Sequence, residues 1–299
     1  MPPPTAPAAP QATLLCVHPH PDDESIACGG VLARAADQGV RTVVVTCTGG
    51  EEGDNLAGID LGGEDLVAHR RRELAAALTA LSVTAHHWLG YRDSGMAGLD
   101  SNQHPDSFHT AEVEEAAARL AAIIRAERPQ VVVSDDAQGT YGHPDHIQAH
   151  RVTVRAVALA ADDAAPVPGA PWQVAKRYVH TLGRSRLLAV HRALIEAGLA
   201  SPFGAAELTR VEDLPLGADD DAVTTEVDVA PWLAVKRAAL AAHASQIGPD
   251  SFFLNTPEAL TEQMFASEEF VLEEGSVGVA RGREPDLFSG LDHPTQVRQ

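Results

Sequence analysis

Short apolar runs alternate with longer amphipathic stretches along the first half of the chain. The apolar, β-branched runs predict strands at 13–18, 41–48, 85–90 and 129–136. Apolar residues at helical spacing predict helices at 25–39, 68–81, 111–128 and 147–161. Alternating strands and helices pair as parallel sheets through right-handed crossovers. The pattern therefore predicts an α/β fold with a Rossmann-like, doubly wound, mostly parallel sheet and helices on both faces.

The periodic pattern is weaker after residue 164. Strands are expected at 176–183 and 224–229, a helix at 231–246, and a loosely ordered tail after Gly282. We expect three parts: a disordered leader at 1–11, an α/β core at 12–164, and a smaller carboxy-terminal part at 165–299. The last part is expected to pack on the core and shape its pocket, so that both form one continuous domain.

Charge and composition narrow the set of partners. The chain has 22 basic and 42 acidic residues, a formal net charge of −20, which argues against nucleic acid or an anionic membrane as partner. No apolar stretch reaches the length of a membrane span, and the Pro/Ala-rich start lacks the features of a signal peptide. The cysteines (Cys16, Cys28 and Cys47) lack CxxC spacing and are expected in the core of a cytoplasmic protein.

Two polar segments follow predicted strands and share a His-Pro-Asp sequence. They are "HPHPDDES" at 18–25 and "GTYGHPDH" at 139–146. Proline cannot donate to a sheet ladder, so the first strand is expected to end near His18. In doubly wound sheets ligands bind outside the carboxyl ends of the strands. One such segment could be a capped turn, whereas two at the same edge indicate a shared site.

The two segments together offer a ligand set for a metal. His20, Asp23 and His146 would supply two imidazoles and one carboxylate, which suits zinc or iron(II) with an open position. A metal held in this way brings the pKa of its bound water to roughly 7. Spacing leaves two alternatives open: His18 in place of His20, and His150, which follows His146 by one helical turn.

Further ionisable residues in the same segments suit acid–base chemistry. Asp22 is placed beside a ligand to accept a proton from water. His143 is suited to stabilise an oxyanion or to protonate a leaving nitrogen. Asp145 is close enough in sequence to orient that imidazole.

The motifs "HPDDES" and "GHPDH" resemble those of the zinc-dependent N-acetylglucosaminyl deacetylase superfamily, also called PIG-L/LmbE-like. The resemblance covers most of the chain and extends to "VVTCTGGEEG", "RRRELAAALTAL", "WLGYRDSGMAG", "RPQVVVSDD" and "LAAHASQ". The longer set is most similar to the branch that removes acetate from N-acetylglucosaminyl-inositol in mycothiol biosynthesis.

This resemblance implies roles for residues at matching positions. The metal ligands fall on His20, Asp23 and His146, with one divalent metal per chain, zinc or else iron(II). The general base falls on Asp22, and the oxyanion-stabilising or acid histidine falls on His143.

The outer residues of the site are also implied by the resemblance. Tyr141 matches a tyrosine that polarises the amide carbonyl, and Asp93 and an arginine match residues that grip sugar or inositol hydroxyls. We assign the arginine to Arg70 within the run 70–72, because Glu73 follows it at the family's spacing. Gln246 falls in a stretch expected to touch the small-molecule amino-sugar–inositol substrate.

Three other functions stay open at this stage. A mycothiol S-conjugate amidase would use the same chemistry with a larger acyl group. A phosphoesterase would need two bridged metals, whereas one complete ligand set is visible. A nucleotide-binding domain is disfavoured because Gly29 and Gly30 do not make GxGxxG. The oligomeric state is left open.

Overall fold

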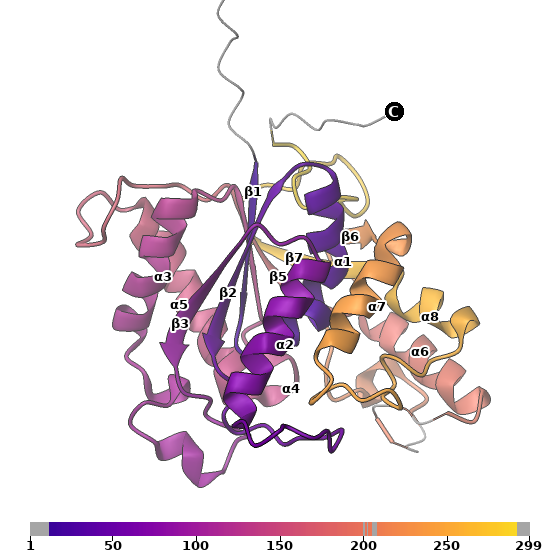
Figure 1. Cartoon of the computed structure of the whole chain (residues 1–299). Coiled ribbons are helices and arrows are strands. Elements are labelled where there is room, and N and C mark those ends of the chain that lie inside the picture. The colour runs from indigo at the N-terminus through magenta and orange to yellow at the C-terminus, as the bar shows by residue number, and fades with distance from the viewer. Residues whose placement is uncertain (1–11, 200, 202, 205–207, 292–299) are drawn as a thin grey trace, which may run out of the picture.

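The computed structural model describes residues 12–199, 201, 203–204 and 208–291. The predicted leader at 1–11 lies outside these residues. A seven-stranded sheet in the order β3-β2-β1-β4-β5-β7-β6 forms the centre of the molecule (Figure 1). Its strands are β1 Thr13–His18, β2 Arg41–Thr48, β3 Ala85–Tyr91, β4 Val131–Ser134, β5 Lys176–Thr181, β6 Thr225–Asp228 and β7 Ser267–Glu274.

Strands β1 to β5 are parallel, and β7 runs antiparallel to both β5 and β6. The predicted α/β fold with a mostly parallel sheet is confirmed. The helices are α1 Asp23–Asp37, α2 Leu66–Ala80, α3 Val113–Glu127, α4 Gly139–Gly142, α5 Pro144–Ala161, α6 Arg184–Glu196, α7 Leu233–Ala242 and α8 Glu258–Phe265. In the described part of the chain, no helix combines the length and apolar character needed to cross a membrane.

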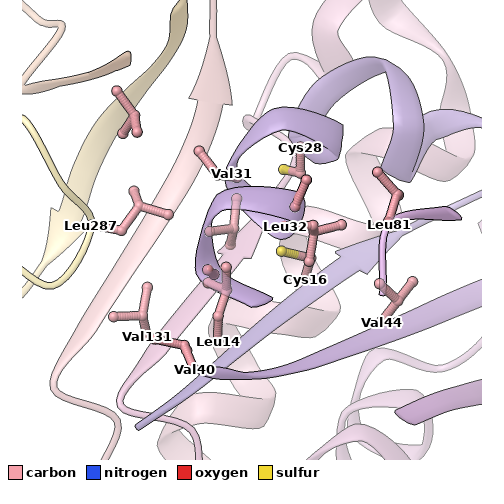
Figure 2. Packing of buried hydrophobic residues seen from close by; sticks show 14 of the residues in the cluster. Leu14, Cys16, Cys28, Val31, Leu32, Val40, Val44, Leu81, Val131 and Leu287 are labelled. Carbon is pink, nitrogen blue, oxygen red and sulfur yellow. The ribbon is translucent and has the colours of Figure 1, made fainter. Parts of the chain in front are cut away.

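Helices cover both faces of the sheet. One face is covered by α3 and α5, and the other by α1, α2 and α7 (Figure 1). Under α1, the side chains of Leu14 and Cys16 from β1 pack against Cys28, Val31 and Leu32 of the helix (Figure 2). All three cysteines are free and buried. This packing of apolar strand residues under helices is the main source of stability for such a fold.

The order of the strands creates the crevice in which a ligand is expected. Strands β1 and β4 are neighbours at the centre of the sheet. From β1 the chain continues to β2 on one side, and from β4 it continues to β5 on the other side. In doubly wound sheets, ligands bind at this switch point, outside the carboxyl ends of the strands. The segments that follow β1 and β4 are the two His-Pro-Asp segments, so the topology brings them to one edge.

Helices α1 and α5, at the two His-Pro-Asp segments, begin earlier than their sequence pattern predicts. Helix α1 starts at Asp23 and α5 at Pro144, which places Asp23 and His146 within first turns. Pro144 suits this position because proline at the start of a helix loses no intrahelical hydrogen bond. The side chain of His143 accepts a hydrogen bond from the backbone N–H of Asp145 and caps α5.

The prediction of a loosely ordered tail after Gly282 is wrong for residues 283–291. Glu284 is fully buried and pairs with Lys176 at 2.6 Å, and the hydroxyl of Tyr178 donates to it at 2.6 Å. Residues 284–289 therefore pack against β5. The sequence pattern also did not predict α6, α8 or β7.

Candidate active site

Three potential metal ligands converge at the switch point. Nδ1 of His20 lies 3.2 Å from Oδ2 of Asp23, and Nε2 of His146 lies 3.6 Å from the same oxygen. One ligand atom from each residue lies within 4.8 Å of the other two. Because β1 pairs with β4, residues more than a hundred positions apart meet in one cluster, in which both histidines are buried and Asp23 is half-buried.

The chemistry of this cluster fits a divalent metal ion. Nε2 of His146 is buried and has no hydrogen-bond partner among the described residues. Buried polar atoms are normally paired, so this nitrogen is oriented for a ligand. Burial by itself raises the pKa of Asp23, but the facing imidazoles of His146 and His20 hold it below its usual range. His20, Asp23 and His146 would thus hold the ion with neutral nitrogens and one carboxylate.

Carboxylates behind the cluster orient both histidines. Oδ1 of Asp135 lies 2.6 Å from Nδ1 of His146, and Oδ2 of Asp145 lies 3.2 Å from Nε2 of His20. Metal-ligating histidines commonly donate their other ring N–H to such a carboxylate. Asp135 was missed at the sequence level, although it directly follows β4, where polar residues indicate a site.

The partner of Asp145 differs from the one suggested by the sequence. Its carboxylate contacts His20 and accepts a hydrogen bond from the backbone N–H of Ser94 at 2.9 Å. Its contact with His143 is made by the backbone, where the Asp145 N–H donates to Nδ1 at 3.1 Å. Asp145 therefore orients a ligand histidine and also fixes the tautomer of His143.

The alternative ligands lie elsewhere. His18 groups with Cys16 and Cys28 below α1. Nδ1 of His150 lies 3.0 Å from the backbone oxygen of Asp135, which gives this nitrogen a partner.

A second His–Asp–His group shares His20. Its other members are Asp93 and His143, and Oδ1 of Asp93 lies 3.4 Å from Nε2 of His20. Both oxygens of Asp93 already accept backbone N–H groups, from Gly95 at 2.8 Å and Glu52 at 3.2 Å. The group with His146, which contains a buried nitrogen without a partner, is therefore the better metal site.

His143 faces the cluster as a neutral ring. Its centroid lies 4.7 Å from that of His20. Burial and the nearby charges of His20 and His146 lower the pKa of His143 to about 4. Because Nδ1 accepts from a backbone N–H, the proton of the neutral ring is on Nε2. His143 can therefore donate a hydrogen bond to an oxyanion.

Asp22 occupies a strained position just before α1. Its φ is 108° and its ψ is −32°, which non-glycine residues rarely adopt. Burial raises the pKa of Asp22 to about 6, and the Arg70 guanidinium, with Nη2 3.3 Å from Oδ2 of Asp22, opposes that rise. A carboxylate with a pKa just below neutrality suits a general base.

Tyr141 lies at the mouth of the cluster, on the short helix α4. The residue is 53% exposed, and its ring centroid lies 5.3 Å from that of His146. Burial of part of the ring and the charge of Asp23 raise the pKa of Tyr141, so its hydroxyl stays protonated and can donate.

The arginines of the run 70–72 have different surroundings. Arg70 is buried and donates to the backbone oxygens of Gly50 at 2.9 Å and Pro21 at 2.7 Å. The guanidinium of Arg71 lies over the ring of Trp88, and Arg72 pairs with Glu64 at the surface. Within the run, Arg70 is the residue that contacts the loop of Asp22.

Gln246 lies beside the loop that follows β2. Its Nε2 donates to the backbone oxygen of Asp54 at 2.8 Å. The structure thus brings Arg70, Asp93 and Gln246 to the same region as the His–Asp–His cluster, and their contacts with substrate stay a prediction.

A doubly wound α/β sheet with a His–Asp–His cluster at its switch point defines an α/β protein with a candidate divalent-metal site. Residues 15–157 match the model of the GlcNAc-PI de-N-acetylase family, PIG-L. The chain is 45% identical over 96% of its length to 1D-myo-inositol 2-acetamido-2-deoxy-alpha-D-glucopyranoside deacetylase 1 of Catenulispora acidiphila, of which 93% is covered. It is 46% identical over 93% of its length to the 1D-myo-inositol 2-acetamido-2-deoxy-alpha-D-glucopyranoside deacetylase of Thermomonospora curvata, of which 96% is covered. The chain belongs to the PIG-L family and is a deacetylase.

Solved structures share the fold. A conserved protein of Thermus thermophilus matches with a TM-score of 0.57 and 24% identity, over 90% of this chain and 98% of that chain. The N,N'-diacetylchitobiose deacetylase of Pyrococcus horikoshii matches with a TM-score of 0.52 and 22% identity, over 87% of this chain and 83% of that chain.

Proposed function

We propose that this protein hydrolyses the acetamide of 1-O-(2-acetamido-2-deoxy-α-D-glucopyranosyl)-1D-myo-inositol to the free amine and acetate, in mycothiol biosynthesis. The observation that carries the proposal is the convergence of His20, Asp23 and His146 beside the carboxylate of Asp22. Relatives named for this activity share 43–46% identity with over nine tenths of the chain, which supports the choice of substrate.

The proposed cofactor is one zinc ion per chain, with iron(II) as the alternative. When bound, the ion supplies Lewis-acid activation of water and of the amide carbonyl. The donor set of two imidazoles and one carboxylate, with oriented rings, supports this assignment. The three buried thiols fit a reducing compartment, and a cytoplasmic location is part of the proposal.

The protein's own residues move the protons. Asp22 accepts the proton of the attacking water, because its raised pKa makes it a base near neutral pH. The oxyanion that forms from the carbonyl accepts hydrogen bonds from the hydroxyl of Tyr141 and from Nε2–H of His143. His143 is neutral, so the proton that releases the amine comes from Asp22 after it has acted as base. Arg70, Asp93 and Gln246 are proposed to bind the sugar and inositol hydroxyls.

A mycothiol S-conjugate amidase is the second candidate, and one observation favours it. A cavity of about 470 Å³ adjoins Tyr141 and His180 and is lined mainly by apolar residues, among them Phe252, Phe253 and Phe265. The sugar–inositol substrate is polar, whereas the apolar part of a conjugate could occupy this space.

One assay separates the two candidates. Metal-loaded protein is given N-acetylglucosaminyl-inositol and a mycothiol S-conjugate in parallel, with a chelated sample as control, and the products are identified by mass spectrometry. We expect metal-dependent release of acetate and one ion per chain by metal analysis. Cleavage of the conjugate alone would favour the amidase, and two ions per chain would favour a phosphoesterase.

A further inference from the structure

A buried carboxylate–imidazole pair lies behind the proposed base, outside the His–Asp–His cluster. Glu24 is the second residue of α1, and His243 follows the last residue of α7. Nε2 of His243 lies 2.8 Å from Oε1 of Glu24, and both side chains are fully buried. Burying two ionisable groups is costly and does not by itself add stability, so the pair requires another explanation.

The second oxygen of Glu24 connects this pair to Asp22. Oε2 of Glu24 accepts a hydrogen bond from the backbone N–H of Asp22 at 3.0 Å. The hydroxyl of Ser25 donates to Oε1 at 2.5 Å, so both oxygens of the carboxylate are engaged. Glu24 thereby joins His243 to the backbone of the residue that carries the base.

The backbone of Asp22 needs this support. Its positive φ of 108° persists only where the surroundings hold it. Arg70 holds the side-chain end, since it contacts Oδ2 of Asp22 and the backbone oxygen of Pro21. The Glu24 carboxylate holds the backbone of Asp22 by accepting a hydrogen bond from its N–H.

His243 is itself held firmly in place. Two residues further on, Ser245 donates its backbone N–H and its hydroxyl to Glu73 of α2, at 2.7 Å and 2.6 Å. The segment 243–246 is therefore attached to α1 through Glu24 and to α2 through Glu73. These contacts restrain His243 and, through its 2.8 Å contact, Glu24.

We propose that Glu24 and His243 are positioning residues that keep Asp22 in its strained backbone conformation and so direct its carboxylate toward the reacting water. The proposal rests on the proposed function, in which Asp22 is the base. Without the pair, the N–H of Asp22 loses its acceptor, the backbone relaxes toward negative φ, and the carboxylate turns away from the cluster.

The test uses variants of matched shape in the full-length, metal-loaded protein. His243→Met removes the donor to Glu24. Glu24→Gln keeps one acceptor oxygen of two, so it cannot accept both from the N–H of Asp22 and from Nε2–H of His243 in the observed arrangement. We expect each to lower kcat about 10- to 100-fold, less than the loss expected from removing the base itself, with KM changed less than about threefold. His243→Gln keeps an N–H donor and should recover most of the lost rate.

Lys236→Met is the matched structural control. Lys236 also lies on α7, is buried, and donates to the backbone oxygen of Ile26 on α1 at 2.9 Å and to Glu268 at 2.7 Å. We expect this variant to lower the denaturant midpoint while kcat stays near that of the unsubstituted protein. Metal content should stay near one ion per chain in every variant.

A double-substitution cycle decides between positioning and general stability. In an Asp22→Ala background, His243→Met should change the remaining rate less than about threefold, because the pair acts through Asp22. An equal loss in both backgrounds would overturn the positioning role and leave Asp22 as base. Near-normal activity of Asp22→Ala alone would instead overturn the base assignment. If His243→Met fails to fold, Glu24→Gln carries the same cycle.

Discussion

Oδ1 of Asp135 lies 2.6 Å from Nδ1 of His146, and both side chains are buried. The carboxylate keeps the ring proton on Nδ1 of His146 and leaves the Nε2 lone pair directed at the centre of the His–Asp–His cluster. The contact therefore sets both the tautomer and the direction of a ligand. Asp135 also accepts from Nε2 of His180 at 2.8 Å, which fixes its own position.

Asp135→Asn is expected to weaken metal binding about 10- to 100-fold, the usual effect of losing such a partner. The reason is that an amide can present its NH₂ group to His146 and disfavour the ligating tautomer. Competition with a chromogenic chelator measures the affinity directly. Asp37→Asn, at the exposed end of α1, is the control and should bind metal normally. Unchanged affinity in Asp135→Asn would contradict the orienting role.

Asp22→Ala should keep its metal and lose about 10²- to 10⁴-fold in turnover, the typical contribution of a general base. The ligands His20, Asp23 and His146 are untouched by this change, so metal analysis should still find one ion per chain. Acetate release under saturating substrate gives kcat. A variant with near-normal kcat would show that another group takes the proton from water.

The activity should fall at acid pH because of Asp22. Its pKa is raised to about 6, so the carboxylate is protonated, and unable to act as base, below that pH. We expect kcat/KM to level off above about pH 6 and to fall about tenfold per unit well below it. Metal content must be measured at each pH. The residual activity of Asp22→Asn should not fall at acid pH in this way. If the same fall is still seen in this variant, it is caused by another group.

Tyr141→Phe should lower kcat about 10²-fold, the lower end of the effect of removing one oxyanion donor. Phenylalanine keeps the ring beside His146 and removes the hydroxyl alone, so KM should change little. Tyr91→Phe is the control, because the ring of Tyr91 packs on Phe108 and under the guanidinium of Arg119. If Tyr141→Phe behaves like this control, the hydroxyl does not contact the reacting carbonyl.

Glu284→Gln should destabilise the fold without touching the site. Glu284 and the Lys176 it pairs with are 0% and 1% exposed, so its loss leaves a buried ammonium without its counter-charge. Removing one partner of a buried pair costs about 3–5 kcal/mol in the free energy of unfolding. Denaturant titration measures the loss. Arg210→Ala, which breaks an exposed pair with Glu212, should leave the midpoint unchanged.

Much of the parallel half of the sheet could be predicted from the sequence. The strands at 13–18 and 41–48 coincide with β1 and β2, because a strand buried on both faces reads as a continuous apolar run. The runs that form β1 and β4 are followed by the His-Pro-Asp segments, so the location of a site at this edge was also predictable.

Strand β7 shows why the carboxy-terminal half was harder to predict. Its sequence "SEEFVLEE" carries two acids near its start that are buried in the structure. Glu268 is paired with Lys236 and accepts the backbone N–H groups of Gly30 and Val31, while Glu269 is paired with Arg283. Most of these partners lie far away in the chain, so hydrophobic periodicity does not reveal the strand.

The sequence by itself determined the elements around β1 and β4 and the residue types needed to hold a metal, because both depend on neighbours within a few positions. The tertiary structure decided which atoms meet. Pairing of β1 with β4 brings His20 to His146 and the carboxylate of Asp145 to His20 rather than to His143. The packing of α7 on α1 brings His243 to Glu24. These contacts follow from the packing of segments that are far apart in the sequence, so the local sequence pattern does not predict them.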